Sequence, residues 1–340
     1  SGGGTGGHIF PAIAIANALK EIDNGMEILF VGAEGRMEME KVPAAGYKIE
    51  GLWISGLQRR LTFDNLYFPF KVISSVMRAK KIIKTFRPHV AVGTGGFASG
   101  PLLYVAARMK IPALIQEQNS FPGITNKILA KKVNKICVAY NGMEKYFPKD
   151  KIIVTGNPVR QDILDMEGKK ESAMKFFNLD AAKKTLLVIG GSLGAKTINE
   201  SILASFELLK QNNIQLIWQT GKGYIETAQK ICPDPERRSM WIGAFITKMD
   251  FAYACADIVV SRAGAISLSE LAIARKPSIL VPSPNVAEDH QTKNAMALVK
   301  EDAAVLIKDI EARENLGKEI ISLMNNTAKQ NMLSCNIAKR

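Results

Sequence analysis

The sequence predicts an α/β protein built from two doubly wound, Rossmann-like domains that face each other across a cleft. Short β-branched, apolar runs alternate with amphipathic stretches along all 340 residues, a pattern typical of parallel sheets covered by helices. A polar, charge-rich stretch at 161–184 interrupts this pattern, so we expect domains at 1–160 and 161–340. Each part has a glycine-rich turn that leads into a helix, which predicts an anion-binding seat on both walls of the cleft.

The expected strands follow one another in chain order, each separated from the next by a helix-like segment. They are 27–31, 89–92, 112–116, 135–139 and 151–156 in the first domain, and 185–191, 215–219, 240–243, 257–262, 277–281 and 303–307 in the second. A glycine turn of this kind normally follows a buried strand, yet nothing precedes Ser1. We therefore expect the chain to lack the first strand of its sheet.

The length and composition of the chain indicate the number of domains and argue against metal sites and disulfides. The length suits two domains, and 47% hydrophobic residues suffice for each to bury a core. No C-x-x-C pair and no metal-ligand spacing occurs among the cysteines and histidines, which are Cys137, Cys232, Cys255, Cys335, His8, His89 and His290. We therefore expect no zinc site, no disulfide framework, no bound metal and no cofactor.

The net charge of +13 predicts an anionic partner: a nucleic acid, a phosphorylated substrate or an acidic membrane surface. We expect no nucleic acid, because basic and aromatic residues do not interleave and no recognition motif is visible. No apolar run approaches the roughly 18 residues that span a bilayer, and no signal peptide is visible.

The opening loop, Gly2–Gly7, carries the first anion seat. Its glycines fit the G-x-G-x-x-G spacing of dinucleotide folds, with Glu34 as a candidate ribose-binding acid, but that signal is weak. The spacing does not explain His8, which lies in the first turn of the following helix and is either a packing residue or a group that acts beside the seat. Pro11 is expected where a first helical turn tolerates proline.

Three further glycine turns follow strands. The turn at 190–197 nearly spells a nucleotide-binding P-loop, but Ala195 replaces the second glycine, which disfavours an ATPase. The turn at 93–101 should lie at the carboxyl edge of the first sheet beside the opening loop. The turn at 262–264 opens a helix in which Ser267 and Glu270 have the spacing of a capping box, so Glu270 is either a cap or a carboxylate that receives both ribose hydroxyls of a nucleotide.

The ordered set of motifs resembles the MurG family of bacterial N-acetylglucosaminyltransferases. The matching segments are GGGTGGHIFPA, GTGGFASGP, QEQNSFPG, GNPVR, GGSLGA, AFITKM, RAGAISLSE and HQTKNA. The resemblance implies the GT-B architecture and transfer of GlcNAc from UDP-GlcNAc to the C4 hydroxyl of MurNAc in undecaprenyl-pyrophosphoryl-MurNAc-pentapeptide (lipid I). Inversion of the anomeric centre would give lipid II for peptidoglycan synthesis, at the cytoplasmic face of the plasma membrane.

The resemblance also implies roles for individual residues. His8 would be the catalytic base or orient the acceptor. The glycine-turn residues that approach the substrates would be Thr5, Gly6, Gly7, Gly95 and Gly96. Asn119 and Gln291 would hold the GlcNAc, and Arg160 and Ser192 would meet the diphosphate. The backbone of Ile246 would bracket uracil, and Glu270 would bind ribose. The helix-terminal N–H groups would come from Ala265, Ile266, Ser267, Leu268 and Ser269.

Two departures from the family pattern bear on these roles. His290 stands beside Gln291 where a second glutamine is common, so the sugar contacts are expected to differ. Family members usually continue beyond the position of Arg340 into a helix that returns to the first domain.

The alternative functions at this point are another GT-B transferase, a sugar-nucleotide epimerase of similar build, and a nucleic-acid binder.

The stretch at 66–88 combines aromatic and aliphatic residues with several cations. These are Lys71, Arg78, Lys80, Lys81, Lys84 and Arg87. The composition fits a segment that lies on an anionic membrane surface, and equally a domain helix with a solvated basic face.

Overall fold

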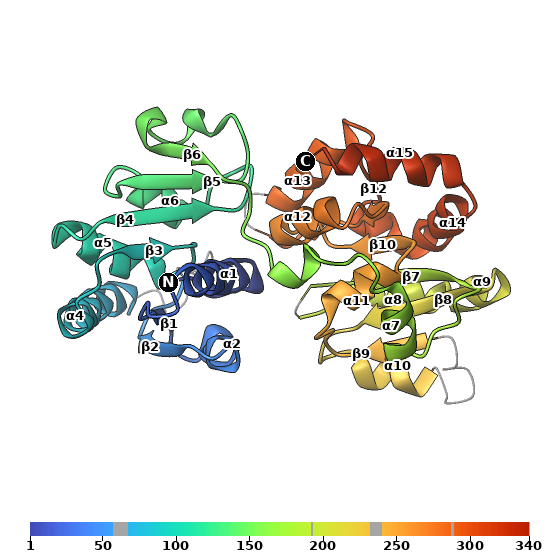
Figure 1. Ribbon diagram of the computed structural model, residues 1–340, viewed down its shortest axis with the longest axis horizontal. Coiled ribbons are helices and arrows are strands. Elements are labelled where there is room, and N and C mark those ends of the chain that lie inside the picture. Colours follow the sequence, from blue (N-terminus) through green and yellow to red (C-terminus); the bar gives the residue numbers. More distant parts are fainter. Residues whose placement is uncertain (57–66, 192, 232–239, 287–288, 340) are drawn as a thin grey trace. The chain divides into compact units, whose positions relative to one another are not determined.

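The computed structural model describes residues 1–56, 67–191, 193–231, 240–286 and 289–339. The chain divides into two compact units, Ser1–Val159 and Arg160–Arg340, and each is described by itself (Figure 1). None of the helices within these described ranges is long and apolar enough to cross a membrane.

The strands of the first unit form a two-stranded and a four-stranded parallel sheet, ordered β1-β2 and β3-β4-β5-β6. They are β1 (Leu29–Ala33), β2 (Lys48–Leu52), β3 (Ala91–Gly93), β4 (Ala113–Glu117), β5 (Lys135–Val138) and β6 (Ile152–Val154). The sequence pattern did not predict β2, because only Leu52 of this strand is fully buried and its other residues are not a run of apolar side chains.

Ser1 lies between the two sheets of the first unit. Its nitrogen donates to the Val92 carbonyl (2.7 Å), its carbonyl accepts from the Thr94 amide (2.8 Å), and its hydroxyl donates to the Val31 carbonyl (2.7 Å). A cavity of about 630 Å³ opens here, lined by residues that include Ile15 and Phe86.

The α-helices described in the first unit cover both faces of its two sheets. They are α1 (Gly6–Ile22), α2 (Glu38–Ala44), α4 (Phe68–Phe86), α5 (Ser99–Arg108) and α6 (Ile124–Leu129). Alternate residues of β1 point to opposite faces. Phe30 shares a buried cluster with Ile9 of α1 and Val42 of α2, whereas Val31 belongs to the cluster that contains Ile83 of α4.

The second unit has one parallel sheet of six strands, ordered β12-β11-β10-β7-β8-β9. They are β7 (Lys184–Ile189), β8 (Ile214–Gln219), β9 (Met240–Gly243), β10 (Ile258–Ser261), β11 (Ser278–Leu280) and β12 (Val305–Leu306). The chain runs outward from β7 in one direction and from β10 in the other, so the strand order reverses between these two neighbours. In open α/β sheets, ligands bind at the carboxyl ends of the strands at such a switch point.

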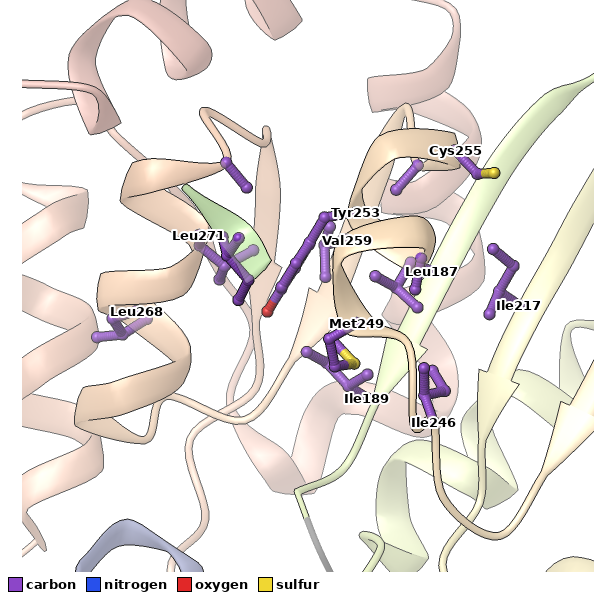
Figure 2. Close-up of a cluster of buried hydrophobic side chains, with 14 of the residues drawn as sticks. Leu187, Ile189, Ile217, Ile246, Met249, Tyr253, Cys255, Val259, Leu268 and Leu271 are labelled. Atoms are coloured by element: carbon purple, nitrogen blue, oxygen red, sulfur yellow. The ribbon is translucent and has the colours of Figure 1, made fainter. Parts of the chain in front are cut away.

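Helices cover both faces of this sheet as well. They are α7 (Lys170–Phe176), α8 (Lys196–Ala204), α9 (Phe206–Gln211), α10 (Ile225–Ile231), α11 (Met249–Cys255), α12 (Ala265–Ile273), α13 (His290–Val299), α14 (Ala312–Met324) and α15 (Thr327–Ile337). On β7, Leu187 packs in the cluster that contains Tyr253 of α11 and Leu271 of α12 (Figure 2). Its neighbour Leu186 belongs to the opposite cluster, with Ile198 of α8. Parallel sheets with helices on both faces confirm the predicted fold class.

Candidate functional site

The opening loop of the first unit presents the beginning of a helix. Helix α1 begins at Gly6 with Thr5 as its N-cap, so Gly6, Gly7 and His8 form its first turn. The N–H of His8 donates to the Thr5 carbonyl (3.1 Å), whereas those of Gly6 and Gly7 lack intrahelical acceptors. The prediction for Pro11 was wrong in position, because Pro11 is the sixth residue of α1 and lies beyond the first turn.

The two glycine loops of this unit meet backbone to backbone. Gly96 has φ +85°, and a Cβ there would collide with the carbonyl of Gly3. Gly95 has φ +101°, and its Cβ would lie 2.8 Å from both Cε1 and Nδ1 of His8. The structure therefore brings Gly95 and Gly96 together with the opening loop and with the imidazole, and only glycine leaves room for this approach.

The imidazole of His8 is partly exposed and has a specific partner. Its Nδ1 lies 3.0 Å from Oε1 of Gln118, which follows β4. The His8 carbonyl accepts a hydrogen bond from the hydroxyl of Thr94 (2.7 Å), which follows β3. Both partners come from strand ends of the four-stranded sheet, and the sequence pattern had singled out neither of them.

Asn119 is oriented by a buried carboxylate. Glu117 is 1% exposed and accepts hydrogen bonds from the Asn119 side chain (3.2 Å), the Asn119 amide (3.1 Å), the Gly123 amide (3.1 Å) and Asn126 (2.8 Å). One acid thus fixes the loop that carries Asn119. The available signal was an acidic residue at the end of a predicted buried strand.

A second buried carboxylate holds the opening loop. Glu38, at the start of α2, is 0% exposed and accepts from the amides of Gly4 (2.9 Å) and Ala33 (3.0 Å). Sequence reasoning missed this residue too, because its partners are defined only by the fold.

In the second unit, helix α12 begins at the switch point after β10. It begins at Ala265, its N-cap is Gly264, and no side chain caps it. Ser267 is therefore inside the first turn, and the alternative in which Ser267 and Glu270 form a capping box is wrong. The first-turn N–H groups of Ala265, Ile266 and Ser267 lack intrahelical acceptors, whereas the N–H of Leu268 donates to the Gly264 carbonyl (3.0 Å). Ser269 turns its hydroxyl back to the Ala265 carbonyl (3.2 Å).

Glu270 is the buried acid of this site, with 6% of its surface exposed. One oxygen accepts from Nε of Arg160 (3.1 Å) and the other from the hydroxyl of Tyr253 (3.2 Å). Burial raises the pKa of Glu270, and the Arg160 charge partly opposes that rise. Burial, reinforced by the Glu270 charge, holds the pKa of Tyr253 well above its usual value. The structure thus joins two residues that the sequence had assigned to the diphosphate and to ribose.

Gln219, at the end of β8, connects the glycine turn after β7 with Ile246. Its Nε2 donates to the Gly191 carbonyl (2.9 Å), and its Oε1 accepts from the Ile246 amide (2.9 Å). Ile246 is 1% exposed, and its N–H already has an acceptor within the protein. Ser192, the next residue of the glycine turn, lies outside the described residues.

Gln291, in the first turn of α13, is fixed beside the same sheet edge. Its Oε1 accepts from the amide of Ser283, in the segment after β11 (2.9 Å). Arg262 donates to the carbonyls of Val281 (3.0 Å) and Pro282 (3.1 Å) and pairs with Asp309. These contacts hold the segments that follow β10 and β11 together.

The chain matches two family models, the glycosyltransferase family 28 N-terminal domain at residues 1–138 and the C-terminal domain at residues 185–340. It is 58% identical, over 99% of its length and 90% of the relative's, to a protein of Cytophaga hutchinsonii. It is 56% identical, over 99% and 92%, to one of Parabacteroides distasonis. Both are named UDP-N-acetylglucosamine–N-acetylmuramyl-(pentapeptide) pyrophosphoryl-undecaprenol N-acetylglucosamine transferase. The crystal structure of Acinetobacter baumannii MurG superposes with a TM-score of 0.74 at 26% identity, covering 99% of this chain and 93% of that one.

Proposed function

The chain belongs to the glycosyltransferase family 28 enzymes that transfer N-acetylglucosamine to a pyrophosphoryl-undecaprenol acceptor, and from this premise we propose how its two units share the reaction. The enzyme moves GlcNAc from UDP-GlcNAc to the C4 hydroxyl of MurNAc in lipid I and forms lipid II. In the proposed division, the second unit holds the nucleotide and the first unit supplies the base.

The observation that carries the proposal is Glu270, which is buried at the switch point and fixed by Arg160 and Tyr253. A carboxylate can accept about four hydrogen bonds, so two engaged oxygens still have lone pairs for the ribose hydroxyls. The first turn of α12 offers N–H groups and a positive dipole end to a diphosphate. Arg160, with Ser192, would meet the same diphosphate, and Ile246 would border the base.

The departing UDP gathers negative charge, so fixed donors at the diphosphate stabilise the transition state. The acceptor hydroxyl must lose a proton as it attacks the anomeric carbon, and the imidazole of His8 is the group placed to take it. Thr5 and the first-turn amides of α1 would face the acceptor, and Asn119 and Gln291 would hold the GlcNAc.

A radiolabelled transfer assay with a lipid I analogue tests this division. We expect His8→Ala to lower turnover roughly 10²- to 10⁴-fold while leaving UDP affinity nearly intact. The matched control is His89→Ala, an exposed histidine outside the site. Near-normal turnover of His8→Ala would remove His8 from the chemistry.

Calorimetry tests the nucleotide half of the proposal. Glu270→Ala should weaken UDP binding by more than tenfold, because hydrogen bonds to a charged group contribute about 1.5–3 kcal/mol. Glu314→Ala, at an exposed position of α14, is the control. Unchanged affinity in a folded Glu270→Ala variant would contradict the assignment.

The proposal also covers the membrane, because the acceptor's lipid remains in the bilayer. Helix α4 exposes Phe70 (65%), Ile73 (58%) and Met77 (62%) at helical spacing. The exposed Lys81 and Lys84 continue the same face toward the end of the helix. An apolar face that ends in lysines suits the boundary between acyl chains and anionic headgroups. We place the enzyme peripherally at the cytoplasmic face of the plasma membrane.

Vesicle sedimentation tests the membrane surface. Each lysine near an anionic surface contributes about 1 kcal/mol, so reversing Lys80, Lys81 and Lys84 should weaken binding to phosphatidylglycerol vesicles by at least roughly two orders of magnitude. The control reverses three exposed lysines of the second unit, Lys230, Lys300 and Lys318. Equal binding to neutral and anionic vesicles would refute the proposal that α4 binds an anionic membrane surface.

A further inference from the structure

A chain of three side-chain amides lies behind the imidazole of His8. Gln118 faces Nδ1 of His8 with its Oε1 at 3.0 Å. Its Nε2 donates to the backbone carbonyls of Thr94 (2.8 Å) and Gln116 (3.1 Å). A backbone carbonyl can only accept, so the amide nitrogen of Gln118 must face these two oxygens. Its oxygen is therefore the atom that faces the ring.

The rest of the network fixes this orientation a second time, because Nε2 of Gln118 also donates to Oε1 of Gln116 (2.5 Å). Nε2 of Gln116 donates to Oδ1 of Asn157 (3.1 Å), and Nδ2 of Asn157 donates to the Gln118 carbonyl (3.1 Å). Gln116 is 2% exposed and Gln118 is 1% exposed, so neither can exchange these partners for bulk water. Turning the Gln118 amide over would place its oxygen against two carbonyls and leave buried donors unpaired, which costs about 1–3 kcal/mol for each group.

We propose that Gln118 is a positioning residue that holds His8 in the tautomer with its proton on Nδ1. An amide oxygen only accepts, so Nδ1 must be the donor in this hydrogen bond, and a neutral imidazole carries a single N–H. The lone pair then lies on Nε2. The inference rests on the proposed function, in which that lone pair takes the proton of the acceptor hydroxyl. The imidazolium formed keeps its Nδ1–H bond to Gln118.

Two features of the structure, one at Gln118 and one at Gly95, suit the imidazole to act as a base. The amide oxygen of Gln118 is neutral, so it fixes the tautomer without adding a charge beside the ring. The glycine at position 95 lets the ring lie against the backbone of the neighbouring loop. The imidazole is thereby held from two sides, which a base needs in order to meet the hydroxyl at hydrogen-bond distance.

Nitrogen-15 spectroscopy of histidine-labelled protein reads the tautomer directly and without substrate. The chain has only three histidines, and the His8 signals are identified by their loss in His8→Ala. When the ring of wild-type His8 is neutral, we expect its single proton to lie on Nδ1. A wild-type spectrum with the proton on Nε2 would overturn the inference, whatever the transferase activity.

Gln118→Met removes the acceptor and keeps the length of the side chain. We expect the His8 proton to redistribute onto Nε2 and kcat to fall about 10- to 100-fold, with KM for UDP-GlcNAc unchanged. The matched control is Gln215→Met, since Gln215 is 0% exposed and bonded only within the second unit, to Asp180, Lys183 and Thr185. This control should lose stability and leave the His8 spectrum and kcat unchanged.

The outcomes separate the inference from the proposed function. A Gln118→Met variant with the wild-type His8 spectrum and wild-type kcat would refute the positioning role. Full turnover in His8→Ala, together with the Nδ1 tautomer in the wild type, would instead refute His8 as the base and leave the assignment of the tautomer standing.

Discussion

Replacing Gly95 with alanine should impair catalysis through a contact that glycine alone permits. The new Cβ would lie 2.8 Å from Cε1 and Nδ1 of His8, so the ring must retreat about 0.6 Å to reach the 3.4 Å at which ordinary contact begins. It cannot move freely, because its Nδ1 is bonded to Gln118. A 1 Å misplacement of a catalytic group can cost roughly 10²-fold in rate, so we expect kcat to fall about 10- to 100-fold.

The same substitution also strains the backbone, and this effect must be separated from the displacement of the ring. A side chain in a left-handed conformation costs roughly 1–2 kcal/mol. Gly35→Ala is the matched control, because Gly35 has φ +68° and nothing within 4 Å of the added Cβ. We expect both variants to lose stability in thermal unfolding, whereas only Gly95→Ala should lose kcat in the transfer assay. Equal kcat values in the two variants would refute the reasoning.

Two further predictions follow from pKa shifts. Burial raises the pKa of Glu270, so the contribution of this group to the free energy of unfolding is greatest while it is protonated and is lost as the pH rises through its folded-state pKa. Glu270→Gln should lack that loss. Urea titrations of both proteins at several pH values check this, and stability curves that run parallel with pH would contradict it. Burial raises the pKa of Cys255 to about 11, so roughly one thiol in a thousand is ionised at pH 8, and iodoacetamide should modify the exposed Cys335 in native protein and Cys255 only after unfolding. Rapid alkylation of Cys255 in the folded state, detected by peptide mass spectrometry, would contradict this.

Local patterns predicted most of the fold. Apolar runs predicted every strand described in the second unit. Four of these strands, β7, β8, β10 and β11, are buried almost throughout, and strands buried on both faces are continuously hydrophobic. The edge strand β2 was missed for the converse reason, since its residues are mostly partly exposed. The position of His8 in the first turn of α1 also followed from local sequence.

Contacts between distant segments could not be predicted in this way. His8 and Gln118 are 110 residues apart, and so are Arg160 and Glu270. Their pairing depends on which strand ends the topology brings together, which periodicity does not specify. The sequence therefore identified residues whose side chains are able to bind substrates or transfer protons, and the fold supplied the partners that orient them.

The meeting of the two glycine loops has a consequence for how this protein can evolve. Most binding sites change their preference by exchanging side chains, one codon at a time. In the acceptor site that we propose, the two glycine loops meet through their backbones, and a side chain at Gly96 would strike the carbonyl of Gly3. Selection for a different acceptor would have to act through neighbours that do carry side chains, such as the exposed Thr5 and Phe97. Randomised libraries built to alter acceptor choice should therefore vary those two positions and leave the glycines intact.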